Sequence, residues 1–130
     1  MTSISGEFSV GMTTRDAEGE SPAIGRMLLD KQYRGALEAR GAGQMLATHG
    51  STAGSAAYVA LETVTGTLLG REGSFALVHH GRMDRGQPTL LITVVPDSGT
   101  GALAGLSGRM GIRVEGHQHF YDFEFTLPTP

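Results

Sequence analysis

The dominant feature of this chain is an alternation of period two between apolar and polar or small residues, interrupted by glycine-rich turns. Residues 58–68 place Tyr58, Ala60, Glu62 and Val64 on one face, as a strand with one buried side does. The same alternation, or a continuous apolar run, marks further strands at residues 4–12, 74–80, 89–95 and 117–127. Turn-rich stretches separate these runs at residues 15–22, 49–55, 82–88 and 96–101. From these runs and turns we infer about eight strands, separated by short connections.

This pattern predicts an all-β fold: a single domain over residues 1–130, forming a closed, mainly antiparallel barrel of about eight strands. A closed barrel leaves no exposed sheet edge, which a chain of long apolar strands requires. Residues 26–40 are an alternative helical region, because Ala, Leu, Glu, Arg and Lys favour helix there, but Gly35 interrupts it.

One glycine-spaced phrase, Gly-x-Leu-x-Gly-x-x-Gly, occurs at residues 66–73 and again at 101–108, with a weaker copy from Gly35. Glycine permits the bulges and corners at which barrel strands begin and end. We therefore expect each copy to turn the backbone, with Leu68 and Leu103 plugging one end of the barrel. Dinucleotide or phosphate binding by these loops is disfavoured, because no helix follows the glycines, and a P-loop is excluded, because the chain has no Gly-Lys-Ser/Thr sequence.

Composition narrows the classes of partner. The net charge is −3 without runs of like charge, which argues against a nucleic-acid partner. There is no cysteine, so disulfide and thiolate chemistry are excluded. The first residues lack a signal-peptide pattern, and no stretch is long and apolar enough to form a membrane-spanning helix, so we expect a cytoplasmic protein without a membrane partner. Apolar residues on both faces of several strands favour a homo-oligomer, a dimer or larger.

Glu62 is the most informative residue, because a carboxylate inside a small barrel must be hydrogen-bonded, paired or protonated. A hairpin turned around residues 70 and 71 would set Glu62 opposite His79 in an apolar interior. We predict an acid–base site with Glu62 or His79 as the base and Tyr58 as the donor. The alternative is a structural network that holds strand register. Covalent catalysis is disfavoured, since the chain lacks an activated serine and its one lysine, Lys31, is not placed on a strand by the pattern.

The histidines suggest a second kind of site. His117 and His119 lie two apart on one strand face, and with Glu124 they resemble the first metal motif of cupins. Glu124 would face away from the histidines in a regular strand, and the second cupin motif is missing before Pro130. His79 with His117 and His119 is the remaining arrangement. We expect no metal and no cofactor, and keep a histidine-ligated metal site as an alternative.

Three stretches, YVALETVTGTLLGREGSFALVHHG, LITVVPDSGTGALAGLSGRM and HFYDFEF, together resemble a family of small bacterial proteins classified as a domain of unknown function. The resemblance covers nearly the whole chain and implies a closed eight-stranded barrel similar to that of allene oxide cyclases, usually oligomeric. It also implies a polar position at residue 44, where Gln44 stands in place of a frequent carboxylate. The fold comparison does not carry an activity with it.

The leading hypothesis is a cofactor-independent enzyme whose barrel lumen takes a mainly apolar organic molecule and performs proton transfer, isomerisation or cyclisation. Its candidate catalytic residues are Glu62, His79 and Tyr58. The candidate substrate-binding residues are Gln44, Phe75, His119, Tyr121 and Phe123. The rivals are a small-ligand-binding barrel without catalysis and an oligomeric structural protein with a filled core.

Overall fold

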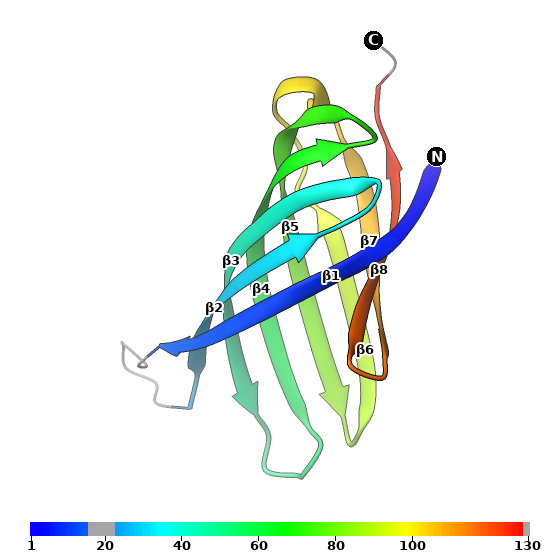
Figure 1. Ribbon diagram of the computed structural model, residues 1–130. Helices are drawn as coiled ribbons and strands as arrows, with labels where there is room; N and C mark the ends of the chain where they lie inside the picture. Colours follow the sequence, from blue (N-terminus) through cyan, green and yellow to red (C-terminus); the bar gives the residue numbers. More distant parts are fainter. Residues whose placement is uncertain (16–22, 129–130) are drawn as a thin grey trace.

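The computed structural model describes residues 1–15 and 23–128, and it shows a closed barrel of eight antiparallel strands (Figure 1). Each strand pairs with its neighbours in sequence, and β8 returns to pair with β1. The strands are β1 (Thr2–Arg15), β2 (Gly25–Tyr33), β3 (Leu37–His49), β4 (Ala56–Leu68), β5 (Arg71–Asp84), β6 (Gln87–Val94), β7 (Ser107–Glu115) and β8 (Gln118–Thr126). The all-β barrel prediction is confirmed; its likeness to allene oxide cyclases stays a prediction. Of the turn expected at residues 15–22, all but Arg15 lies outside the described residues.

Alternation along the strands sorts side chains between the lumen and the outer surface. On β4, Ala60, Glu62 and Val64 are buried while Val59 and Leu61 between them are exposed. The β4–β5 hairpin turns at Leu69 and Gly70, one residue earlier than expected. The expected pairing of Glu62 with His79 is therefore wrong by two residues.

The register sets Glu62 against Leu77 and Ala60 against His79. A slip of two residues preserves the face of every side chain, because side chains alternate with period two. Glu62 and His79 are thus diagonal neighbours inside the barrel rather than direct partners.

Residues 26–40 form the β2–β3 hairpin, so the helical alternative is wrong. Gly35, at φ +107°, makes the turn that an interrupted helix could not accommodate. The hydroxyl of Tyr121 lies beside it, donating to the carbonyl of Arg34 at 2.8 Å and accepting from the amide of Leu37 at 3.2 Å. Long-range hydrogen bonds from β8 therefore stabilise this hairpin in place of local helical ones.

One end of the barrel is filled. Leu68 and Leu103 are buried there, the latter on a short 3₁₀ turn, η1 (Gly101–Leu103), between β6 and β7. Phe75 stacks on Phe123 with ring centroids 5.8 Å apart. The expectation that the glycine-spaced phrases turn the backbone and that both leucines plug this end is confirmed.

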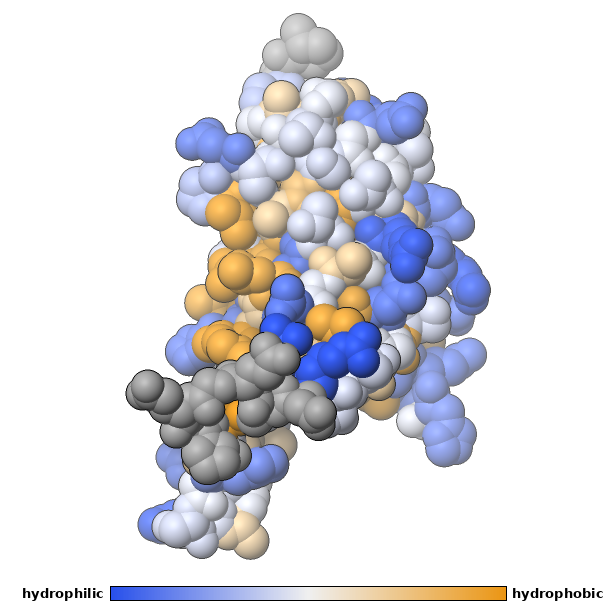
Figure 2. All heavy atoms as spheres, turned by 90° about the vertical axis from the view of Figure 1, so that its left-hand side faces the viewer, coloured by the Kyte–Doolittle hydropathy of each residue, from blue (hydrophilic) through white to orange (hydrophobic). Residues whose placement is uncertain are grey.

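The opposite end, at the bottom of Figure 1, carries the β3–β4 loop and the β5–β6 turn. Strands β6 and β7 pair only through Ile92 with Met110 and Thr93 with Arg109, so their seam ends well before the β5–β6 turn. The outer surface mixes polar and apolar side chains, and one region of it is rich in apolar atoms (Figure 2). Within the described residues, the structure has no helix that could cross a bilayer.

Candidate functional site

The centre of the lumen holds a buried ionic cluster built around the carboxylate of Glu62. Its Oε1 accepts hydrogen bonds from Nζ of Lys31 at 3.1 Å and from Nε2 of His79 at 2.8 Å. Its Oε2 accepts one from the hydroxyl of Tyr33 at 2.5 Å. All four side chains are buried. We call Lys31, Tyr33, Glu62 and His79 the central cluster.

Two glycines of β3 make this cluster sterically feasible. Strand β3 lies between β2, which carries Lys31 and Tyr33, and β4, which carries Glu62. A Cβ added at Gly41 would overlap Oε2 of Glu62, and one at Gly43 would overlap the backbone around Glu62. The absence of side chains at both positions lets the Glu62 carboxylate cross over β3 to reach β2.

The protonation of the cluster follows from these contacts. Burial alone would raise the pKa of Glu62, but the hydrogen bond from His79, the charge of Lys31 and the hydroxyl of Tyr33 together lower it. Burial and the neighbouring carboxylate raise the pKa of Tyr33 well above its ordinary value. At neutral pH, Glu62 is therefore an anion that accepts from Tyr33, whose phenol keeps its proton.

An ionised Glu62 fixes the tautomer of His79. Because Oε1 can only accept, Nε2 of His79 must carry a proton, and the neutral ring then has its lone pair on Nδ1. His79 has a hydrogen bond at Nε2 only, and within residues 1–15 and 23–128 the one buried side-chain nitrogen or oxygen without a partner is Nε of Arg26. Nδ1 of His79 thus has no hydrogen-bond partner among the described residues.

The lumen widens from the cluster toward the open end into a cavity of about 540 Å³. The inward-facing part of its lining is mostly apolar and includes Met27, Met45, Ala47, Tyr58, Met83 and Leu90, with His49 at its rim. The three methionines are flexible, polarisable side chains that can adapt to a ligand. We call this space the mouth cavity.

Tyr58 connects the mouth cavity to the central cluster. It pairs with Gly81, and a Cβ at that glycine would collide with the phenol ring, so the ring extends across β5 at this position. His79 lies one inward position deeper on the same strand. Burial raises the pKa of Tyr58, which keeps its hydroxyl protonated and able to donate.

The structure brings together Glu62 and His79 as expected, with Tyr58 in the adjacent position. Phe75 and Phe123 lie in the filled end, and the Tyr121 ring packs edge-on against Tyr33 while its hydroxyl binds the β2–β3 hairpin. These three side chains support the cluster from the side away from the mouth cavity.

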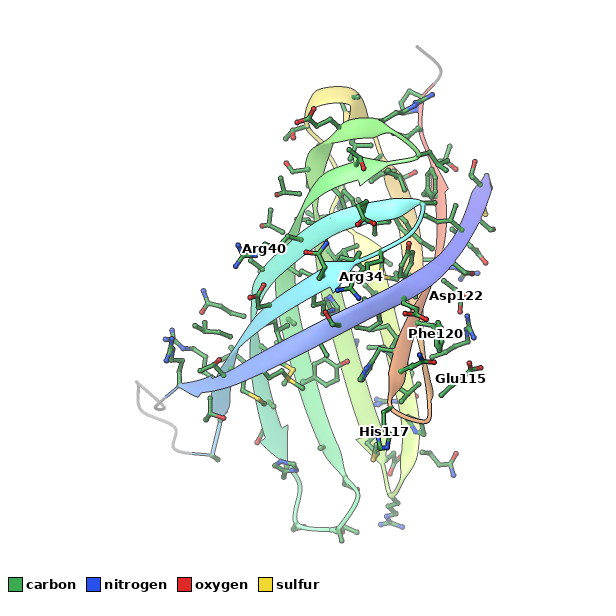
Figure 3. All side chains as sticks on the ribbon, viewed as in Figure 1. Arg34, Arg40, Glu115, His117, Phe120 and Asp122 are labelled. Carbon is green, nitrogen blue, oxygen red and sulfur yellow. The ribbon has the colours of Figure 1, made fainter. Side chains whose placement is uncertain are left out.

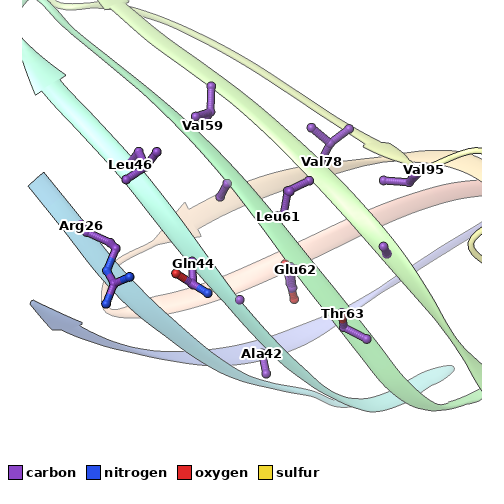
Figure 4. A pocket seen from close by; sticks show the side chains of 13 residues that line it. Arg26, Ala42, Gln44, Leu46, Val59, Leu61, Glu62, Thr63, Val78 and Val95 are labelled. Carbon is purple, nitrogen blue, oxygen red and sulfur yellow. The ribbon is translucent and has the colours of Figure 1, made fainter. Parts of the chain in front are cut away.

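The remaining candidates lie elsewhere. His119 faces the lumen beside Phe8, with ring centroids 5.4 Å apart. Gln44 is exposed on the outside of β3, where it lines a separate hollow (Figure 4), so it does not join the lumen residues.

The histidines do not converge on a metal site. His117 is exposed in the β7–β8 turn (Figure 3), while His119 and His79 face inward from β8 and β5. Glu124 lies on the outer side of β8, with Arg109 at 3.4 Å. Among the residues that the structure describes, no three His, Asp or Glu side chains are grouped closely enough to hold a metal ion.

Lys31 and Tyr33 are the members of the central cluster that the sequence analysis missed. Residues 26–33 also alternate, with Met27, Leu29, Lys31 and Tyr33 on one face. The helix-favouring composition of the region concealed this period. Lys31, the chain's one lysine, lies between Leu29 and Tyr33 on that face, and this position could have indicated a buried lysine.

Fold and site together define a small up-and-down β-barrel with a buried ionic cluster at its centre and an apolar cavity at its open end. The chain belongs to the family described as Protein of unknown function (DUF3224), which it matches over residues 4–125. It is similar to a crystal structure of a DUF3224-family protein of unknown function from Shewanella oneidensis MR-1, with 47% identity and a TM-score of 0.94. That match covers 100% of this chain and 99% of the other. No curated protein matches the chain.

The first prediction concerns the space that Gly41 of β3 leaves for the Glu62 carboxylate. Replacing Gly41 with Ala should lower the free energy of unfolding by about 1–3 kcal/mol, because the new methyl group displaces the Glu62 carboxylate and overpacks the lumen. Urea denaturation measures the change. The control is Gly11→Ala on β1, where a Cβ meets nothing closer than 3.9 Å and stability should stay equal or rise by up to about 1 kcal/mol. Equal losses in both variants would contradict the packing argument.

A second prediction concerns pH. Because the folded-state pKa of Glu62 is lowered, its contribution to stability is present above the ordinary value of 4.5 and disappears as the pH falls through the folded value. Glu62→Gln should lower the free energy of unfolding by about 3–5 kcal/mol at neutral pH, and the difference from the wild type should shrink below pH 4.5. Chemical denaturation across pH tests this.

Asp122 supplies the control for that series. The hydrogen bonds from Arg113 and Ser5 lower its pKa too, but the carboxylate lies at the surface. Asp122→Asn should change stability little at any pH, and added salt should weaken its effect. A Glu62→Gln deficit that stays constant down to pH 3 would show that the carboxylate charge does not stabilise the fold.

Proposed function

We propose that this protein binds a mainly apolar small organic molecule in the mouth cavity and transfers a proton on it without a cofactor. The observation that supports this most is the position of the central cluster, which lies just beyond an open, almost entirely apolar cavity. A barrel of this size does not need a buried Lys–Glu pair for stability, since apolar side chains of similar volume would serve at least as well. Buried, strongly perturbed acid–base groups beside a cavity are typical of functional sites.

His79 is the best candidate for the base. Glu62 already accepts three hydrogen bonds, so it orients the imidazole and stabilises the imidazolium rather than taking the substrate proton itself. Nδ1 of His79 carries the lone pair, has no hydrogen-bond partner among the described residues, and belongs to the inward position next to Gly81, against which Tyr58 lies. The proton removed from a substrate carbon would pass to this nitrogen.

The charges of the cluster favour an anionic intermediate. With Lys31 positive and Glu62 negative, the cluster is neutral overall while His79 is neutral, and it gains one positive charge when His79 accepts a proton. A substrate that loses a proton at carbon becomes an enolate, whose oxygen can accept a hydrogen bond from Tyr58. An enolisable ketone with an apolar body therefore fits the site, and returning the proton to another carbon would isomerise it.

Binding can be tested with N-phenyl-1-naphthylamine, an uncharged dye that fluoresces in apolar cavities. The wild type should enhance its fluorescence, and Ala47→Phe should weaken binding at least about tenfold, or about 1.4 kcal/mol, by filling the mouth cavity. Leu69→Phe, at the opposite end and exposed, is the control. Leu61→Arg, on the outer surface, should leave dye binding unchanged. Equal binding by the wild type and Ala47→Phe would refute a lumen site.

Proton transfer needs its own measurement. The wild type should accelerate exchange of the α-hydrogens of 2-tetralone with D₂O, observed by NMR, over the rate in buffer. His79→Gln should remove about 100-fold or more of the acceleration, the usual share of a general base, and Tyr58→Phe should remove part of it.

The two experiments separate the proposal from its nearest rival. The saturated hydrogen bonding of Glu62 is the observation that favours a rigid, non-catalytic centre. Dye binding together with exchange no faster than in buffer would establish a ligand-binding barrel without proton transfer. Acceleration that survives in His79→Gln would remove this histidine from the role of base.

A further inference from the structure

The candidate base lies deeper in the barrel than the mouth cavity. His79 is 3% exposed, and it occupies the inward row next to that of Tyr58, on the side of the filled end. A ligand in the mouth cavity therefore meets the Tyr58 ring before it meets the imidazole. An exposed fraction this small does not admit a substrate to the ring, so contact with His79 requires part of the barrel wall to move.

The wall is least connected between β6 and β7. These two strands pair only through Ile92 with Met110 and Thr93 with Arg109. Every other pair of neighbouring strands is joined over seven or more positions. A junction with few backbone hydrogen bonds has a low free energy of local opening. We call this junction the β6–β7 seam.

The sequence explains why the pairing stops where it does. Gly111 directly follows Met110 on β7, and a glycine inside a strand weakens the pairing and permits a bend. A Cβ added at Gly111 would meet nothing closer than 4.0 Å, so close packing does not account for this glycine. On β6, Pro88 has no N–H to donate to either neighbouring strand. Both residues therefore favour separation of the two strands toward the open end.

Side chains beside the seam show that the lumen reaches the surface there. Leu90 shares the inward face of Ile92 but is 40% exposed, and Val114 shares the inward face of Met110 but is 61% exposed. In a fully paired wall, the opposite strand would cover both side chains. Leu90 also lines the mouth cavity, so the open part of the seam is continuous with that cavity.

The pairs that close the seam lie at the level of the candidate base. Ile92 pairs with His79 on β5 and with Met110 on β7. The side chains of Ile92 and Met110 are both buried. They therefore separate His79 from the open part of the seam. Loss of the Ile92–Met110 pair alone would extend the opening to His79.

The other end of the seam is fixed. The connection between β6 and β7 is held against β5, where the amide of Val95 donates to the carbonyl of Ala76 at 2.9 Å. In the same connection, the amide of Thr100 donates to the carbonyl of Ser74 at 2.8 Å. On its far edge, β7 is paired with β8 along its whole length. Separation therefore starts at the open end, with β7 and β8 moving together.

We propose that the β6–β7 seam is a side gate to the central cluster: β7 separates from β6 at Ile92 and Met110, and the ligand passes from the mouth cavity to His79. This inference rests on the proposed function, since it concerns a substrate that touches His79. The gap is edged by the apolar side chains of Leu90 and Val114, so passage favours an uncharged, mainly apolar molecule. The closed gate keeps bulk water away from the cluster, as closing elements of active sites commonly do.

Thiol labelling measures the gate without any ligand, because the chain has no cysteine. Met110→Cys places a buried thiol on the seam, and Val64→Cys places one on β4, which is continuously paired with both neighbours. Met110→Cys should react with iodoacetamide at least about 100-fold faster than Val64→Cys, since local opening exposes only the first thiol. The unfolding free energy of each variant, measured in urea, corrects for differences in global stability. Equal corrected rates would overturn the gate.

A disulfide tests whether the gate serves the chemistry. Leu91→Cys with Gly111→Cys locks the seam one residue beyond the Ile92–Met110 pair, at outward-facing positions of the continued register. The matched control is Leu91→Cys with His80→Cys, which joins β6 to its fully paired neighbour β5. Oxidation of the first variant should slow its exchange of the α-hydrogens of 2-tetralone at least about tenfold relative to its reduced form. The control should exchange equally in both forms.

Dye binding separates failure of the gate from failure of the proposed function. The locked variant should still bind N-phenyl-1-naphthylamine, because the mouth cavity lies outside the gate. Equal exchange by the locked and reduced forms of an active variant would overturn the gate and leave the proposed function intact. Loss of dye binding on locking would also overturn it, since the cavity and the seam would then open together. A wild type that does not accelerate exchange would refute proton transfer and the passage of substrate to His79, while the thiol rates decide whether the seam opens.

Discussion

A single buried carboxylate organises the interior of this barrel. Glu62 cannot be left alone in an apolar lumen, because an unpaired buried charge would cost far more than the fold can supply. Its three hydrogen bonds come from two strands, β2 and β5, on opposite sides of β4. The hydrogen bonds of the Glu62 carboxylate therefore fix the positions of β2 and β5 relative to β4. It also explains why β3, which lies between, has glycine where a side chain would block the way.

The same alternation produces two different surfaces from one set of strands. Inside, β4 presents Glu62 and Tyr58; outside, it presents Val59 and Leu61. The filled end is closed by aromatic and leucine side chains, whereas the open end ends in methionines and small residues around a cavity. The side chains of the lumen and those of the outer surface can therefore change independently, although both depend on the same register.

Much of this could be predicted from the sequence, because period-two alternation survives small errors of register. The strand faces of Glu62 and His79 were predicted correctly even though the hairpin pairing was two residues out. The turn at Leu69 explains that error, since a non-glycine residue with positive φ gives no strong signal in the sequence. Recognising the β4–β5 hairpin was enough to predict that Glu62 and His79 lie close together.

The part that could not be predicted depends on contacts between strands. Lys31 is far from Glu62 along the chain, and its strand was obscured by helix-favouring neighbours. Gln44 was assigned to the site by family resemblance, but the parity of β3 places it outside. The role of Gly41 becomes visible only when Glu62 is known to cross over it. Because glycine has no side chain, the alternation of apolar and polar residues does not show that a glycine faces inward.

The burial of Lys31 has a consequence for the reactivity of the whole molecule. It is the only lysine of the 130 residues, so every surface cation along the chain, apart from the amino terminus, is an arginine or a protonated histidine. An electrophile that attacks primary amines finds no side-chain target while the barrel is closed. Acylation of Lys31 requires its ammonium group to leave Glu62 and lose a proton, so the rate of that modification reports how often the central cluster comes apart.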